Sequence, residues 1–192
     1  MRFSNRQSRK HQFAFSLIEL MVTLSVVGVL MAIALPNLRD FVVSNRLSSQ
    51  VNGFIGLINY ARSEAIGRNQ SVLVCAKNAN NNECSTAGLW TDLEIQVFVD
   101  VDGDNSWSAG DTLLKRIAPY DSTLTQTKFE RLGNNSYIEF NASGLAMVPM
   151  RFNINAISPD TSYELKYGRT ICITKPGRTR VIPFQNGACS NF

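Results

Sequence analysis

Cationic side chains gather in the last part of the sequence, where no acidic side chain accompanies them. From residue 166 onward the chain carries five basic residues, Lys166, Arg169, Lys175, Arg178 and Arg180, and no Asp or Glu. Guanidinium groups stay charged at physiological pH and donate hydrogen bonds in a planar fork, which suits phosphate oxygens. The segment is therefore a candidate phosphate-binding site, although clustered charges also occur on ordinary solvated surfaces.

A predicted β-hairpin holds three of these cations. Two runs rich in β-branched residues flank the tetrapeptide 175–178 (Lys-Pro-Gly-Arg), and Pro followed by Gly predicts a type II turn because glycine accepts a positive φ. Arg178 and Arg180 lie two residues apart on the second strand, so strand alternation places them on one face, with Lys175 across the turn. The predicted site comprises Lys175, Gly177, Arg178 and Arg180, and Arg169 would widen it.

A second charged segment is acidic. From residue 92 to residue 111 the chain has six acidic residues and no Lys or Arg. The part from Asp100 to Asp111 resembles a calcium-binding loop because oxygen-bearing side chains alternate, but it lacks glycine at the sixth place and glutamate at the twelfth. Since aspartate and glycine are also typical of hairpin turns, no metal site and no cofactor are predicted.

The sequence favours a binding or structural protein over an enzyme. Its single histidine is His11, so no Ser–His or Cys–His pair exists beyond the N-terminal segment. The spacing of Cys75, Cys84, Cys172 and Cys189 does not resemble a structural zinc site and favours disulfides formed in an oxidising compartment. Three pairings are possible. The pairing of Cys75 with Cys84 and of Cys172 with Cys189 closes short local loops and is the one we expect.

A long helix followed by short strands must position these residues. Apolar residues recur mostly at steps of three and four from Leu47 to Ala65, which predicts an amphipathic half-helix over residues 36–69. Strands that follow one helix without alternation predict an α+β fold with antiparallel pairing, in one β-rich head over residues 70–192. The predicted strands are short β-branched and aromatic runs at 71–76, 94–99, 112–118, 137–141, 150–154, 169–174 and 179–183.

The N-terminal segment predicts a membrane anchor. Residues 15–35 contain one charged side chain, Glu19, and this length is enough to cross a bilayer as a helix. Residues 1–14 hold four of the 19 basic residues and none of the 15 acidic ones, so the remainder of the chain is neutral. The positive-inside rule leaves residues 1–14 in the cytoplasm and sends the head outward. Ala32 and Ala34 offer only a weak match to a signal-peptide cleavage site.

An unpartnered carboxylate such as Glu19 raises the free energy of inserting a helix into a membrane by about 2.5–3.5 kcal/mol. The nearest positive charge would be the α-amino group created by a cut between Ala14 and Phe15. Residues 14–20 (Ala-Phe-Ser-Leu-Ile-Glu-Leu) resemble the processing motif of type IV prepilins. The resemblance implies that a prepilin peptidase removes the leader, residues 1–14, and methylates Phe15. It also implies that Glu19 pairs with the Phe15 amine of a neighbouring subunit during assembly.

Two features qualify this resemblance. Ala14 stands where glycine is commonest in the motif, and an ordinary single-pass anchor remains the alternative.

The order of one helix followed by a sheet also resembles the GspH and FimT group of pseudopilins and minor pilins, whose β-sandwich-like head packs on the helix. Residues 177–180 (Gly-Arg-Thr-Arg) resemble the G-R-x-R motif of FimT minor pilins, which implies that Arg178 and Arg180 bind DNA during natural transformation.

The resemblance defines the expected partners and location. The expected partners are double-stranded DNA, contacted at its phosphates without sequence preference, other pilins, a prepilin peptidase and the inner membrane. The expected location of the head is the periplasm. Lys175 and Arg169 are added to the DNA site on charge and geometry alone. The alternative function is that of a structural minor pilin or GspH-like pseudopilin that takes part in filament assembly without binding DNA.

Overall fold

The computed structural model describes residues 15–81, 83–120, 122, 127–157, 161–184 and 189, without the side chains of 35–37, 39, 161 and 163. Contacts divide the chain into two compact units, residues 1–41 and residues 42–192, which we call the N-terminal unit and the head. The expected leader, with Ala14, lies outside the described residues.

One helix, α1, runs from Leu17 to Arg68 and contributes to both units. Its helical assignment continues through Pro36 without interruption. The stretch Leu17–Ala34 has a mean hydropathy of 2.4 and no buried residues, so it is long and apolar enough to cross a membrane. Glu19 lies in the first turn of α1, where a carboxylate is favoured by the unpaired backbone N–H groups of the helix start.

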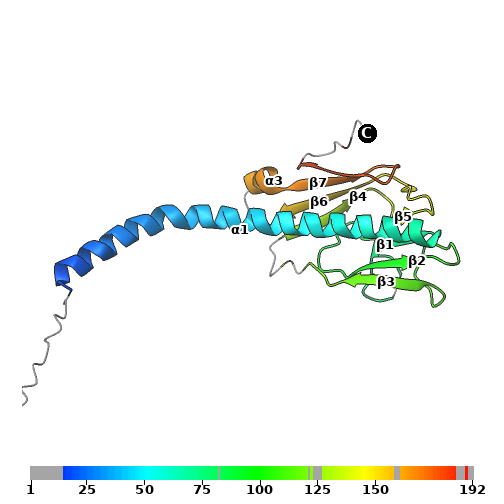
Figure 1. Cartoon of the computed structure of the whole chain (residues 1–192), viewed down its shortest axis with the longest axis horizontal. Coiled ribbons are helices and arrows are strands. Elements are labelled where there is room, and N and C mark those ends of the chain that lie inside the picture. The colour runs from blue at the N-terminus through cyan, green and yellow to red at the C-terminus, as the bar shows by residue number, and fades with distance from the viewer. Residues whose placement is uncertain are drawn as a thin grey trace, which may run out of the picture. The chain divides into compact units, whose positions relative to one another are not determined.

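Two four-stranded antiparallel sheets form the head around the second half of α1 (Figure 1). The first sheet has the strand order β3-β2-β1-β5, with β1 Val72–Ala76, β2 Ile95–Val99, β3 Thr112–Ile117 and β5 Tyr137–Phe140. The second sheet has the order β4-β6-β7-β8, with β4 Thr127–Leu132, β6 Met150–Ala156, β7 Arg169–Ile173 and β8 Thr179–Pro183. This is the predicted α+β arrangement of a long helix packed on an antiparallel head.

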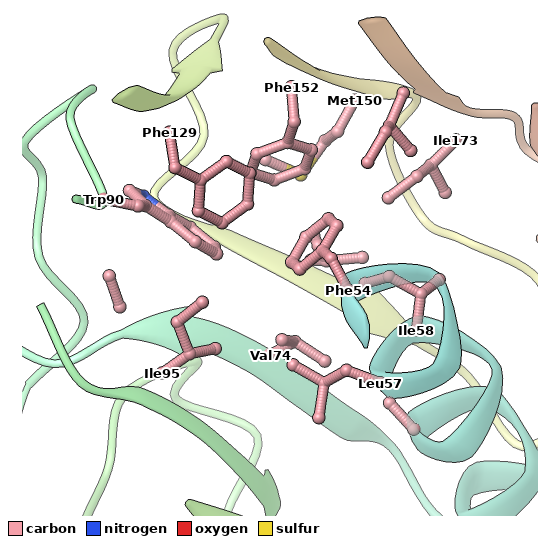
Figure 2. Packing of buried hydrophobic residues seen from close by; sticks show 14 of the residues in the cluster. Phe54, Leu57, Ile58, Val74, Trp90, Ile95, Phe129, Met150, Phe152 and Ile173 are labelled. Carbon is pink, nitrogen blue, oxygen red and sulfur yellow. The ribbon is translucent and has the colours of Figure 1, made fainter. Parts of the chain in front are cut away.

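The main core lies where α1 meets both sheets. Figure 2 shows Phe54, Leu57 and Ile58 of α1 pointing toward side chains of the two sheets, among them Val74 and Phe152. Phe54 packs edge-to-face against Phe152 with ring centroids 4.8 Å apart, a geometry that aromatic rings prefer. All buried residues of this cluster belong to the head, so the head contains a complete hydrophobic core.

The first sheet is covered on its other face as well. Leu73, Cys75 and Phe98 form a second buried cluster there, beneath Trp107 and Tyr137. Trp107 comes from the acidic segment between β2 and β3, and its ring packs edge-to-face on Phe98 at 5.4 Å. Because both faces of β1 and β2 are buried, these strands contain almost only apolar residues.

Two elements of the head differ from the sequence-based expectation. Strand β4 was not predicted, and neither was α3, a short helix from Thr161 to Tyr167. In β4 four of the six residues are polar or charged, Thr127, Lys128, Glu130 and Arg131, which dilutes the β-rich signal. Since α3 has only seven residues, it shows no extended periodicity by which a helix could be recognised.

Candidate nucleic-acid interface

The turn of the β7–β8 hairpin lies one residue earlier than its sequence predicted. The Gly177 N–H donates to the Thr174 carbonyl at 2.8 Å, so the hydrogen-bonded turn spans Thr174 to Gly177, one residue earlier than the expected turn at 175–178. The Thr174 N–H then donates to the Arg178 carbonyl at 3.0 Å and closes the hairpin. Gly177 follows the turn with φ 73°, the positive value for which glycine was expected.

Gly177 is buried because the turn is pressed against neighbouring backbone. A Cβ built on this residue would lie 2.4 Å from the Gly144 carbonyl oxygen and 2.9 Å from the Arg62 Nε. Gly144 itself has φ 71°, and its Cβ would lie 2.6 Å from the Ile66 side chain. Glycine at both positions therefore lets the β5–β6 loop and the β7–β8 turn approach α1 closely.

Arg62 of α1 joins these two segments to the helix. Its Nε donates to the Gly144 carbonyl at 2.9 Å, and its Nη1 donates to the Gly177 carbonyl at 3.3 Å. A further bond fixes the turn from the other side, because the Ala146 N–H donates to the Lys175 carbonyl at 2.9 Å. The hairpin tip is therefore held by α1 and by the β5–β6 loop. Sequence analysis did not identify Arg62 or Gly144, since both act through contacts between distant parts of the chain.

Arg178 and Arg180 both lie exposed beside this fixed tip. Together with Thr174, Pro176 and Thr179 they line a surface pocket of about 380 Å³. Arg180 pairs with Cys172 in the β7–β8 ladder. The hydrogen bond from the Thr174 N–H to the Arg178 carbonyl closes this ladder at the turn. The two arginines are therefore on the same face, as strand alternation requires.

Lys175 and Arg169 have different surroundings. Lys175 is exposed in the turn and lines a second depression beside Leu145 and Met147. Arg169 begins β7, at the far end of the hairpin, about 17 Å from the turn for five strand residues. Its guanidinium donates to the carbonyls of Tyr167 and Gly168 at 3.1 and 2.8 Å, at the end of α3. The structure thus brings Lys175, but not Arg169, next to Arg178.

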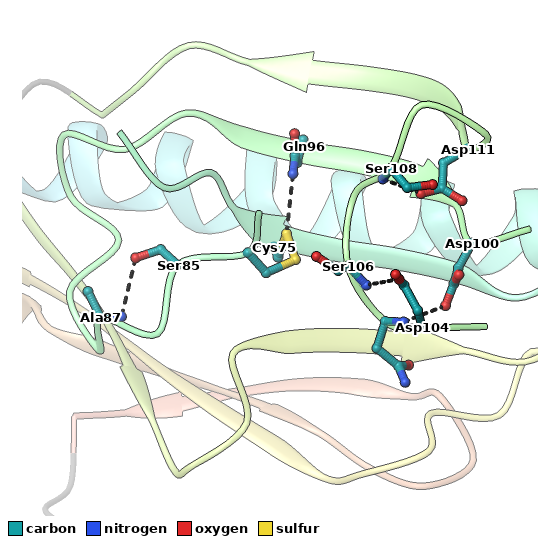
Figure 3. The surroundings of a disulfide bond; sticks show 11 residues. Cys75, Ser85, Ala87, Gln96, Asp100, Asp104, Ser106, Ser108 and Asp111 are labelled. Carbon is teal, nitrogen blue, oxygen red and sulfur yellow. Dashed lines mark hydrogen bonds between the residues drawn. A yellow bond between two sulfur atoms is a disulfide. The ribbon is translucent and has the colours of Figure 1, made fainter. Parts of the chain in front are cut away.

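The two disulfides join neighbouring segments. Cys75 bonds to Cys84 and Cys172 bonds to Cys189, which is the local pairing expected from the sequence. Figure 3 shows the first bond below Gln96, whose amide donates to the Cys75 sulfur at 3.6 Å. The second bond leaves from β7, directly opposite Arg180, and braces the hairpin near its arginines.

The acidic segment folds into a loop tied by its own carboxylates (Figure 3). One carboxylate oxygen from each of Asp100, Asp102 and Asp104 lies within 4.8 Å of the other two. The two oxygens of Asp100 accept bonds from the Gly103 and Asn105 N–H groups at 2.8 and 3.1 Å. Burial raises the pKa of Asp100, and these N–H donors partly offset the shift. Backbone N–H groups of the loop thus bond to its own carboxylates and close it.

Comparison with known proteins identifies the class. The family described as Type II transport protein GspH matches residues 50–177, about two thirds of the chain, which cover the second half of α1 and most of the head. The chain belongs to the GspH family. The prokaryotic N-terminal methylation motif also matches residues 9–35, the segment in which the processing motif was found. With a GspH match over the head and a methylation motif at its N-terminal segment, this GspH-family chain belongs with the pilins and pseudopilins.

The fold is similar to that of a solved minor pilin. The type IV minor pilin FimU of Pseudomonas aeruginosa matches in two crystal forms, with TM-scores of 0.54 and 0.50 and sequence identities of 18% and 17%. These matches cover 72% and 71% of this chain and 90% and 92% of FimU. The minor pseudopilin EpsH of Vibrio cholerae matches with a TM-score of 0.46 and 12% identity, over 72% of this chain and 97% of EpsH. No curated protein sequence matches.

Proposed function

We propose that this pilin binds double-stranded DNA through the β7–β8 hairpin and takes part in DNA uptake during natural transformation. The observation that carries the proposal is the exposed pair Arg178 and Arg180 on a tip that Arg62 fixes to α1. A cationic loop that is already ordered loses less conformational entropy when it binds a polyanion than a mobile loop does. The hairpin is therefore suited to hold a phosphate backbone.

The chemistry of the pocket favours phosphates over bases. The described residues that line it are Thr174, Pro176, Arg178, Thr179 and Arg180, and they include no aromatic side chain on which a base could stack. Contacts to phosphates alone carry no sequence information. With three to five cations engaged, log affinity should fall with log salt at a slope of about −3 to −5.

A mobility-shift titration with duplex DNA tests the site. The protein is the chain from Phe15 to Phe192 in a neutral detergent, because residues 1–14 carry basic side chains that would confuse the result. The double variant Arg178→Ala with Arg180→Ala should lose binding and keep its circular dichroism spectrum. A matched control is Arg68→Ala with Arg116→Ala, which also removes two positive charges, here from ion pairs with Glu64 and Glu94. Undiminished binding by the hairpin variant contradicts the proposal.

One observation favours the alternative of a structural subunit without DNA binding. The GspH match ends at Gly177, just before the two arginines, so membership of the family does not itself call for them. A strain without this pilin separates the alternatives. Loss of transformation with normal piliation supports DNA uptake, whereas loss of piliation or secretion with normal transformation supports a purely structural role.

The proposal also includes processing and location. A prepilin peptidase would cut between Ala14 and Phe15, which agrees with the methylation-motif match over residues 9–35. The pilin would then be held in the inner membrane by Leu17–Ala34, with its disulfide-bonded head in the periplasm, and assemble with other pilins through Glu19. Mass spectrometry of membrane-extracted protein should find a methylated Phe15 at the N-terminus, and an intact leader in a host with active peptidase contradicts this assignment.

A further inference from the structure

The second sheet has an outer face, turned away from the core, that carries its own pattern of side chains. In β6 the side chains of Met150, Phe152 and Ile154 belong to the core. Strand alternation therefore places the residues between them, Arg151 and Asn153, on the outer face. The Thr170 hydroxyl of β7 donates to Asn153 Oδ1 at 2.8 Å, which shows that both side chains share this face.

Arg151 stands in the same cross-strand row as Arg180. The ladder pairs Arg151 with Cys172, and Cys172 with Arg180, so the two arginines flank this cysteine and its bond to Cys189. Two interstrand spacings place their backbones about 10 Å apart. Arg178 lies two residues before Arg180, about 7 Å along the β8 direction. The three arginines thus form a triangle on one face of one sheet.

We infer that Arg151, which is half-buried in the cross-strand row of Arg180, is a third arginine of the DNA-contacting surface beside the hairpin. This inference rests on the proposed function and adds a residue that is distant in sequence from the motif. A distance of about 10 Å corresponds to about three base pairs of rise along the duplex axis, at 3.4 Å each. Arg151 and Arg180 could therefore contact separate phosphates of the same backbone.

The charges around Arg151 favour DNA contact on this side of the head. On the outer face of β4, Lys128 Nζ lies 3.3 Å from Glu130 Oε2, so this acid is already paired. The acidic loop with Asp100, Asp102 and Asp104 belongs to the first sheet and would repel DNA there. Both Arg151 and Arg180 have interactions within the chain, so part of their side-chain freedom is already lost before DNA binds.

Arg169 is a poorer candidate for the same role. It pairs in the ladder with Ile154, a core-facing residue, and therefore does not belong to the outer face. Its guanidinium is also occupied by three backbone carbonyls at the end of α3. The sequence added Arg169 to the DNA site on charge and geometry, whereas the ladder places Arg151 of β6 on the face that carries Arg180.

The test compares single variants of the Phe15–Phe192 chain in detergent, titrated with duplex DNA at several salt concentrations. Arg151→Ala should weaken binding about fivefold at low salt and make the log–log salt slope less steep by about one, as expected for one lost phosphate contact. Arg151→Lys should keep the slope, because it keeps the charge. The matched control, Arg116→Ala, removes the same charge from the first sheet and should change neither value.

The outcomes separate this inference from the proposed function. If the unaltered chain binds DNA and Arg178→Ala weakens binding, but Arg151→Ala matches the unaltered chain in affinity and slope, the inference is wrong and the hairpin site stands. If the unaltered chain does not bind DNA, the proposed function fails, and the inference fails with it. A thermal unfolding curve for each variant establishes that lost binding is not lost folding.

Discussion

At Gly177 the backbone φ of 73° and the nearby Gly144 carbonyl both exclude a side chain. Gly177→Ala should therefore lower the free energy of unfolding by about 2–3 kcal/mol, from the positive φ together with the displaced backbone. Urea denaturation of the detergent-solubilised chain measures the change. The control is Gly56→Ala, an exposed helical site with nothing within 4 Å of the new Cβ, which should stabilise the protein by up to about 1 kcal/mol. Equal effects at both sites would contradict this account of the turn.

We predict that Glu19, the one charged residue of the apolar stretch Leu17–Ala34, acts by pairing with a neighbouring subunit. Glu19→Gln keeps the size of the side chain but removes the charge that would pair with a neighbouring Phe15 amine. The variant should insert into the membrane normally and be excluded from filaments, as measured by immunoblotting of sheared filaments and of membranes. Thr23→Val serves as the control, because among the described residues the Thr23 hydroxyl donates to the Leu20 carbonyl of its own helix. Normal incorporation of Glu19→Gln would remove the assembly role.

Asp100 makes the stability of the head depend on pH. Burial raises its pKa above the ordinary 3.8, so the folded state binds its proton more readily than the unfolded chain does. The contribution of this group to stability is thus greatest below pH 3.8 and declines as pH rises through the raised pKa. Asp100→Asn should flatten the fall in unfolding free energy above about pH 4, measured by denaturation at a series of pH values. An unchanged pH profile would show that the carboxylate is not destabilised by burial.

At the scale of elements, Arg62 links α1 to the hairpin. Arg62→Met keeps the length of the side chain but leaves the Gly144 and Gly177 carbonyls without their donors. We expect a loss of about 1–3 kcal/mol in unfolding free energy and weaker DNA binding. The salt slope should stay unchanged, because Arg62 positions the site and does not contact phosphate.

The control for this variant is Arg68→Met on the same helix. Arg68 pairs with Glu64 at 2.6 Å and bonds to no part of the hairpin among the described residues, so its loss should leave DNA affinity intact. A reduced salt slope for Arg62→Met would instead place Arg62 in contact with DNA.

The elements that the sequence predicted are those with a strong local pattern. The helix, expected over residues 15–35 and 36–69, and seven strands follow from apolar periodicity and β-branched runs, and all are present. Strand β4 was missed because Lys128 and Glu130 dilute its pattern, and its pairing with β6 depends on contacts distant in sequence. The arginines of the hairpin were visible as a motif, whereas Arg62 and Arg151 join the site only through the fold. Residues that act through long-range packing leave no local signal.

At the scale of the whole molecule, the head should be an independent folding unit. The buried residues of its core begin at Leu47, and the contact boundary lies between Phe41 and Val42. A fragment from Val42 to Phe192, expressed where disulfides form, should therefore unfold cooperatively at the same temperature as the head within the full chain. Circular dichroism at rising temperature tests this. A fragment that unfolds non-cooperatively would show that residues before Val42 contribute to the core.

The bond between Arg62 and the β7–β8 turn has a mechanical consequence. Strand β8 is the edge of its sheet, and tension on a ligand held at Arg178 and Arg180 would tend to peel it from β7 one hydrogen bond at a time. The turn where peeling would start is tethered to α1, the same helix that carries the apolar anchor segment. Traction on such a ligand would therefore be shared between the β7–β8 ladder and the backbone of α1, through the bonds of Arg62.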